Sequence, residues 1–184
     1  GLNRLPTSVM PIADCVAHAI DPTLCEGPTP VLNPKAQPQH ATTKSHQTGD
    51  ALLSGSGLRS QKAFTVRGRA LVTDVPITYL GYVNRDTGVI EEPGHPLDGV
   101  AIADTVLVYP KGSGSTVAPY VLMGLIYTDL GPKAVVNRDI CPLTLPACSL
   151  LGVPYGHGFG DDPCMSINSG DTVEFRRTEH GVEL

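Results

Sequence analysis

The strongest constraint in this sequence is an apolar stretch that runs into a loop of glycine and serine and then into a second apolar stretch. It reads VLVYPKGSGSTVAPYVLMGL and covers residues 106–125. Residues 105–110 form a short apolar run that ends in proline, which is typical of a strand buried on both faces. Residues 115–131 have helical apolar spacing and end at a Gly-Pro pair, so we predict a helix there. A buried strand followed by a helix indicates a domain that packs helices on a sheet.

The predicted helix has one apolar face and a start signal. Its apolar side chains recur three and four residues apart, at Val117, Val121, Leu122, Leu125 and Ile126. Ser115 or Thr116 is expected to cap its first turn, and Pro119 falls within that turn, where a missing N–H costs little.

The loop before this helix is a candidate binding element. Glycines let the backbone approach a ligand closely, and the free N–H groups and positive dipole end of a helix attract a carboxylate or phosphate. The loop lacks the GxxxxGK[ST] spacing of a nucleotide-binding P-loop. A flexible turn with a capping serine explains the motif equally well, so the loop alone leaves structure and binding open.

The composition changes sharply near residue 60. Residues 27–61 are rich in Pro, Gly, Ser, Thr, Gln and His and contain no aromatic residue. Such a stretch buries too little apolar area to offset its ordering entropy, so we predict a linker or disordered arm. We expect residues 1–61 to form an extension with one short helix at residues 12–20, and residues 62–184 to form the globular domain.

The remaining patterns complete the predicted domain. Strands are expected at residues 63–74 with a bulge or bend at Gly68, 77–83, 133–137 and 153–155, a long loop at 84–100, a short helix or turn at 140–152, and a closing hairpin formed by DTVEFRR and GVEL. Asp161 and Asp162 are expected to lie on a solvated turn. This order predicts an α+β domain in which a partly closed β-sheet or barrel carries two helices.

Charge and cysteine usage exclude several classes of function. The net charge is -5 and there is no basic cluster, which argues against nucleic acid and against a membrane surface as partners. The five cysteines are odd in number and form no CxxC motif, which favours reduced thiols in a cytoplasmic protein. Cys15 and Cys25 flank His18, but their spacing fits no standard metal site, so we expect no metal on this chain.

Four segments in order resemble the swivelling domain, or small subunit, of aconitase X enzymes. They are VRGRALVTDVPITYLGYVNRDTGVI (residues 66–90), GHPLDGVAIADTVLVYPKGSGSTVAPYVL (94–122), GPKAVVNRDICPLTLPACSLLGVPYGHGF (131–159) and SGDTVEFRRTEHGVEL (169–184). The resemblance implies a β/β/α swivelling fold that packs against a large catalytic subunit or domain. That large part is expected to carry an iron–sulfur cluster, and the pair is expected to act as a hydro-lyase.

The resemblance also implies roles for residues of the loop. The serine of the family's Gly-x-Gly-Ser-Thr motif acts as proton acceptor, and by position it is Ser115 here. Further substrate-binding residues are then expected at Lys111, Gly112, Ser113, Gly114, Thr116 and His95. The family dehydrates either mevalonate 5-phosphate or cis-3-hydroxy-L-proline, both small carboxylates, and the composition favours the second slightly.

The sequence departs from the family at its opening turn. Asn84-Arg85 stands where the family has Asp-Pro, and Tyr82 replaces a glycine. Residues 1 to about 60 are extra, either the end of a fused preceding domain or an arm that wraps the large subunit. A non-catalytic module that binds a small anion or a partner therefore remains the alternative to an enzyme subunit.

Overall fold

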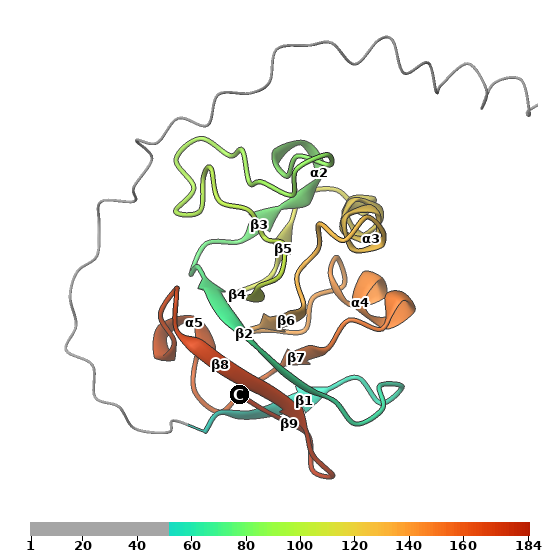
Figure 1. The fold of residues 1–184 in the computed structure, drawn as a ribbon, viewed down its shortest axis with the longest axis vertical. Coiled ribbons are helices and arrows are strands. Elements are labelled where there is room, and N and C mark those ends of the chain that lie inside the picture. Colours follow the sequence, from blue (N-terminus) through green and yellow to red (C-terminus); the bar gives the residue numbers. More distant parts are fainter. Residues whose placement is uncertain (1–51) are drawn as a thin grey trace, which may run out of the picture. The chain divides into compact units, whose positions relative to one another are not determined.

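A closed barrel of seven strands forms the centre of the domain (Figure 1). The structure, a computed structural model, describes residues 52–184. The strands are β1 (Ser54–Gly57), β2 (Thr65–Val72), β4 (Val106–Tyr109), β6 (Ala134–Asn137), β7 (Tyr155–His157), β8 (Thr172–Arg177) and β9 (Val182–Glu183). They follow the order β1-β7-β6-β4-β2-β8-β9, and β9 pairs with β1 to close the barrel. This architecture confirms the predicted α+β swivelling fold.

The four strands β2, β4, β6 and β7 pair in parallel, and their side chains serve two cores. In β4, Val106 and Val108 join Phe175 in one core, while Leu107 and Tyr109 join helix residues in the other. All four residues of β4 are buried. A strand with a core on each face needs apolar side chains at every position, which is why the sequence shows an unbroken apolar run.

Strand β2 bends between two partners. It pairs antiparallel with β8 from Thr65 to Arg69 and parallel with β4 from Ala70 to Val72. Gly68 lies before this change, and a Cβ there would be 3.3 Å from Cγ2 of Val106. The register with β8 is unbroken, so the glycine provides the bend and close approach rather than a bulge.

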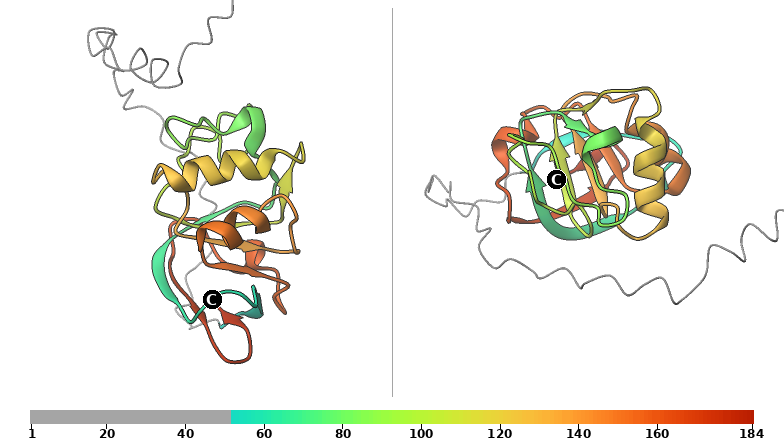
Figure 2. Two further views of the ribbon diagram at one scale, coloured as in Figure 1. Left: turned by 90° about the vertical axis from the view of Figure 1, so that its right-hand side faces the viewer. Right: turned by 90° about the horizontal axis from the view of Figure 1, so that it is seen from above.

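Helices α3 (Ala118–Tyr127) and α4 (Leu145–Leu151) pack against each other on one flank of the barrel (Figure 2). Each has a proline in its first turn, where no intrahelical N–H bond is lost. α3 starts three residues later than the sequence predicts and ends before Gly131. Its cap residue is Val117, with no side-chain bond, so the predicted capping role of Ser115 or Thr116 is wrong.

A second, two-stranded sheet lies beside α3. It pairs β3 (Ile77–Thr78) with β5 (Gly112–Ser113), and the short helical turn α2 (Tyr79–Tyr82) follows β3. The predicted strand over residues 77–83 is therefore only two residues long. Gly81, at a φ of 95°, breaks the extended run.

The globular domain begins earlier than predicted. Strand β1, within the expected linker, pairs with both β7 and β9. Gln61 also belongs to the domain, since its side-chain amide donates to the carbonyl of Val153 and accepts from the amide of Tyr155. The described residues do not include the helix expected at residues 12–20, and they do not include Cys15 or Cys25. A short helix that the sequence did not predict, α5 (Pro163–Ser166), lies between β7 and β8.

Candidate functional site

Six residues that the sequence singled out form one loop between β4 and α3. Lys111, Gly114, Ser115 and Thr116 are exposed, Ser113 is half-buried and Gly112 is buried. The Ser115 carbonyl accepts a hydrogen bond from the Ala118 amide at 2.9 Å, which ties the serine to the first turn of α3. The Ser115 hydroxyl accepts from the Val117 amide at 3.4 Å, a long contact, and the residue is exposed.

The loop is held on one side by the small sheet. Ile77 pairs with Gly112, and Thr78 pairs with Ser113. Gly114 has a φ of 93°, and a Cβ at this position would be 3.1 Å from Cγ2 of Thr78. Its backbone conformation therefore favours glycine, and its close approach to β3 leaves little room for a side chain.

On its other side the loop is held by a buried thiol. The Gly112 amide donates to Sγ of Cys141 at 3.1 Å, and a Cβ at Gly112 would be 3.3 Å from Cβ of Leu143. The glycines of the motif thus let the loop lie tightly against both the β3 segment and the segment that follows β6.

A chain of buried hydroxyl groups lies behind this thiol. The Tyr79 and Tyr109 hydroxyls are 2.7 Å apart, Tyr109 lies 2.8 Å from Oγ1 of Thr144, and Thr144 donates to Sγ of Cys141 at 3.3 Å. The Cys141 amide donates to the Tyr155 hydroxyl at 3.0 Å. Burial raises the pKa of both Tyr79 and Tyr109 well above the usual tyrosine value, so these hydroxyls stay protonated.

His95 lies in a different part of the fold. It belongs to the loop of residues 84–100, and its ring is buried, with 7% of the residue exposed. Its Nδ1 accepts from the Leu97 amide at 3.0 Å, and its Nε2 is buried without a hydrogen-bond partner in the described part of the chain. Its local bond stabilises its own loop, whereas its contact with a substrate stays a prediction.

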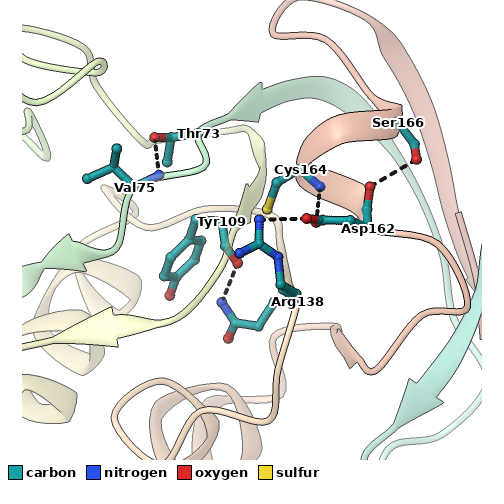
Figure 3. Close-up of polar contacts among 8 residues, drawn as sticks. Thr73, Val75, Tyr109, Arg138, Asp162, Cys164 and Ser166 are labelled. Carbon is teal, nitrogen blue, oxygen red and sulfur yellow. Dashed lines mark hydrogen bonds and ion pairs between the residues drawn. The ribbon is translucent and has the colours of Figure 1, made fainter.

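An ion pair that the sequence did not predict lies where the parallel strands end (Figure 3). Arg138 follows β6, and its Nη2 lies 2.6 Å from Oδ2 of Asp162. Asp162 also caps α5, since its Oδ1 accepts from the Cys164 amide at 3.0 Å. Asp162 is therefore a structural anchor and not the solvated turn residue that we expected. The available signal was its position directly before Pro163, since an Asp followed by a Pro is typical of a helix start.

Several large apolar side chains on α3 and α4, or directly before α3, are exposed, and we refer to them together as the exposed face of α3 and α4. It consists of Val117, Tyr120, Tyr127, Leu150 and Leu151, with exposed fractions between 40% and 84%. A shallow groove of about 240 Å³ on α3 is lined by Arg85, Tyr120, Val121, Gly124, Leu125 and Thr128. Arg85 belongs to the turn that departs from the family pattern, so that turn borders the α3 face.

Metal ligands do not cluster in residues 52–184. No group of three His, Cys, Asp or Glu side chains there can hold a metal ion, and Cys141, Cys148 and Cys164 are free and buried. In the same residues, no helix has the length and apolar character needed to cross a bilayer.

In comparisons with known proteins, the family model described as the aconitase X swivel domain matches residues 58–184 of this chain. The chain is 34% identical over 132 residues to the phosphomevalonate dehydratase small subunit of Pyrococcus horikoshii, a match that covers 72% of this chain and 94% of the relative. It is also 34% identical over 117 residues to the small subunit of the same name from Methanococcoides burtonii, covering 64% of this chain and 85% of that one.

Two solved structures share the fold. The crystal structure of Thermococcus kodakaraensis aconitase X in its holo form matches with a TM-score of 0.62 and 24% identity, over 72% of this chain and 96% of the other. A solution NMR structure of a UPF0107 protein matches with a TM-score of 0.60 and 25% identity, over 73% and 98%. The barrel, the glycine–serine loop and these matches agree, and the chain belongs to the aconitase X swivel domain family.

Proposed function

We propose that this chain is the small subunit of a phosphomevalonate dehydratase, a hydro-lyase of the aconitase X type that dehydrates mevalonate 5-phosphate. The exposed Ser115 hydroxyl, at the end of a loop held on two sides, is the observation that carries this proposal. The named relatives favour mevalonate 5-phosphate, whereas composition alone slightly favoured cis-3-hydroxy-L-proline.

Ser115 is proposed as the base that removes a proton from the carbon next to the substrate carboxylate. A serine hydroxyl is a weak base in water, and it needs surroundings that stabilise its alkoxide. The Val117 N–H already faces Oγ of Ser115, and the N-terminal end of α3 adds a favourable dipole. Covering the loop by a partner would exclude water and strengthen both effects.

The other loop residues are proposed to hold the substrate anion. Lys111 is exposed at the start of the loop and offers a positive charge, while Ser113 and Thr116 offer hydroxyl donors beside Ser115. Gly112 and Gly114 shape the backbone so that its amides can approach a carboxylate or phosphate.

An iron–sulfur cluster on the large partner is proposed to complete the site. The three cysteines of the described residues are buried and belong to no group of three metal-ligating side chains there, so this part of the chain does not fit a cluster. When bound to the partner, the cluster would supply a Lewis acid for the departing hydroxide.

The exposed face of α3 and α4 supports a large partner. Large apolar side chains that two packed helices leave exposed are typical of surfaces that contact another protein. This face begins at Val117, two residues after Ser115, so a partner that covers it would also reach the loop.

The test is the activity of the two-subunit complex. The chain is co-purified with the large subunit under anaerobic conditions, and dehydration of mevalonate 5-phosphate and of cis-3-hydroxy-L-proline is measured. We expect turnover of the first, and we expect Ser115→Ala to assemble normally but to lower kcat by at least about 100-fold. Ser60→Ala, an exposed serine before β2, is the control and should keep full activity. A fully active Ser115→Ala complex would refute the role of the base.

The turn at Asn84-Arg85, which differs from the family pattern, favours one alternative function. This alternative is a non-catalytic module that binds a small anion or a partner. Asn84 forms its own turn, accepting from the Asp86 amide through Oδ1 at 2.9 Å, and it replaces the family's aspartate. If this turn contacts substrate in the family, its changed residues would let this chain bind the substrate anion without supporting turnover. A complex that binds mevalonate 5-phosphate but shows no dehydration would support this alternative.

A further inference from the structure

The thiol of Cys141 occupies an unusual place for a buried cysteine. Only 2% of the residue is exposed, yet its sulfur accepts from the Gly112 amide and from the Thr144 hydroxyl. Cys148, in the core that contains Tyr79 and Tyr109, is fully buried, and burial raises the pKa of its thiol to about 12. One cysteine therefore connects the candidate loop to the core, while the other is a packing residue.

The direction of the hydrogen bonds behind Cys141 follows from the donor count. Thr144 has a single O–H, and it points at the sulfur. Thr144 must then accept from Tyr109, and Tyr109, whose proton is used, must accept from Tyr79. The donors form a one-way chain in a region without water access, where hydrogen bonds strengthen one another.

The start of the loop is consequently held by two independent restraints. The β3 pairing restrains Gly112 from one side, and the sulfur of Cys141 takes its amide on the other. Ser115 lies three residues further along, between this restrained point and the first turn of α3.

We propose that Cys141 is a positioning residue that sets the geometry of Ser115 through the Gly112 amide, and that the chain from Tyr79 to Thr144 orients its sulfur. This inference rests on the proposed role of Ser115 as the base. A misplacement of a reacting group by about 1 Å can lower a rate by about 100-fold, so a restraint at this distance from the serine is sufficient to affect turnover.

The first arm of the test measures kcat in the assembled complex at saturating mevalonate 5-phosphate. We expect Cys141→Ala to lower kcat by about tenfold to 100-fold. Cys141→Ser retains an acceptor for both donors, and we expect it to restore kcat to within about threefold of wild type. Cys148→Ala is the matched control, because it also removes a buried sulfur but leaves the hydrogen bond of Gly112 intact, and it should leave kcat unchanged.

The second arm measures hydrogen exchange at the Gly112 amide in the full chain without its partner. We expect Cys141→Ala to speed this exchange by about five- to tenfold, and Cys141→Ser and Cys148→Ala to leave it near wild type. This arm separates the two proposals. An active Ser115→Ala complex would refute the proposed base, and the exchange data would still decide whether Cys141 restrains the loop.

Three results would overturn the inference. They are an unchanged kcat in Cys141→Ala, an unchanged Gly112 exchange in that variant, or an equal loss of kcat in Cys148→Ala. If Cys141→Ala does not fold, Tyr109→Phe replaces it, since this variant keeps the ring and breaks the chain of hydroxyls. Tyr109→Phe should then lower kcat and speed hydrogen exchange at the Gly112 amide, as expected for Cys141→Ala. A Tyr109→Phe variant with unchanged kcat and unchanged exchange would refute the inference.

Discussion

At the scale of single residues, Asp162 joins two segments that are far apart in the sequence. Its carboxylate binds Arg138 after β6 and caps α5 through the Cys164 amide. Partial burial opposes its ionisation, but the hydrogen bonds from Arg138 and from the Cys164 amide outweigh it, so the pKa of Asp162 lies below its usual value. The charge of this residue is therefore linked to folding.

This linkage predicts an acid-dependent loss of stability. Because the folded-state pKa is lowered, the stabilising effect is present above the unfolded value of about 3.9 and is lost as the pH falls through the folded value. Arg138 is 37% exposed, which limits the effect to about 1 kcal/mol or less. Asp162→Asn, which keeps a capping oxygen, should be less stable than wild type in urea unfolding at pH 7, and the difference should shrink near pH 2.5.

Asp161→Asn provides the control for this prediction. Asp161 is the exposed neighbour of Asp162, so its substitution should leave the free energy of unfolding nearly the same at both pH values. An Asp162→Asn variant whose deficit is as large at pH 2.5 as at pH 7 would contradict the linkage.

At the scale of elements, α3 has two apolar faces with different roles. Val121, Leu122 and Leu125 are buried against the core. Tyr120 and Tyr127, seven residues apart and hence on one face, are 71% and 84% exposed. A helix that carries apolar side chains all round is normally covered on both sides, which indicates that a partner covers the second face.

The exposed face of α3 gives a binding prediction. Tyr120→Asp and Tyr127→Asp together should weaken binding of the proposed large partner by at least about tenfold, because buried aromatic side chains contribute strongly to interfaces. Their exposure in the free chain means that its own thermal midpoint should hardly change. The dissociation constant can be measured by calorimetry with the purified subunits.

A matched substitution on the other side of the barrel makes this test specific. Met165 of α5 is also 71% exposed, and α5 lies away from α3 (Figure 2). Met165→Asp should leave the dissociation constant unchanged. Equal weakening by the α3 and α5 variants would mean that the α3 face is not the interface.

At the scale of the whole molecule, closure of the barrel depends on its two short terminal strands. β1 pairs with β7 and with β9, and β9 pairs with β8. The backbones of Leu53 and Leu184 also exchange two hydrogen bonds, at 2.8 and 2.9 Å. Closure removes free strand edges, which would otherwise pair with other chains.

Truncation tests this role of β1. A chain that starts at residue 52 keeps every strand of the barrel and is the reference for this test. A chain that starts at residue 62 lacks β1 and Gln61, which opens the sheet between β7 and β9. We expect this shorter chain to lose several kcal/mol of stability, given that each buried backbone group left without a partner costs about 1–3 kcal/mol. Equal urea midpoints for the two truncated chains would contradict this role of β1 in closing the barrel.

The sequence by itself determined the elements whose signal is local. The apolar run of β4, the apolar spacing of α3 and the closing hairpin are visible in short windows, because each element must turn apolar side chains toward a core at its own period. The motif also pointed to Ser115 without reference to the fold. The capping prediction failed because residues 115–118 form a turn, closed by the bond from the Ala118 amide to the Ser115 carbonyl, and this turn shifts the helix start to Ala118.

Only the tertiary structure decided which distant segments meet. β1 reads SGSG and has no apolar pattern, since its contribution is backbone pairing with β7 and β9. The contact of Cys141 with Gly112 joins residues 29 apart, and the ion pair of Asp162 with Arg138 likewise depends on how the strands are ordered. Hydrogen bonds and ion pairs of this kind carry no sequence period, because their partners are set by the path of the chain through the barrel.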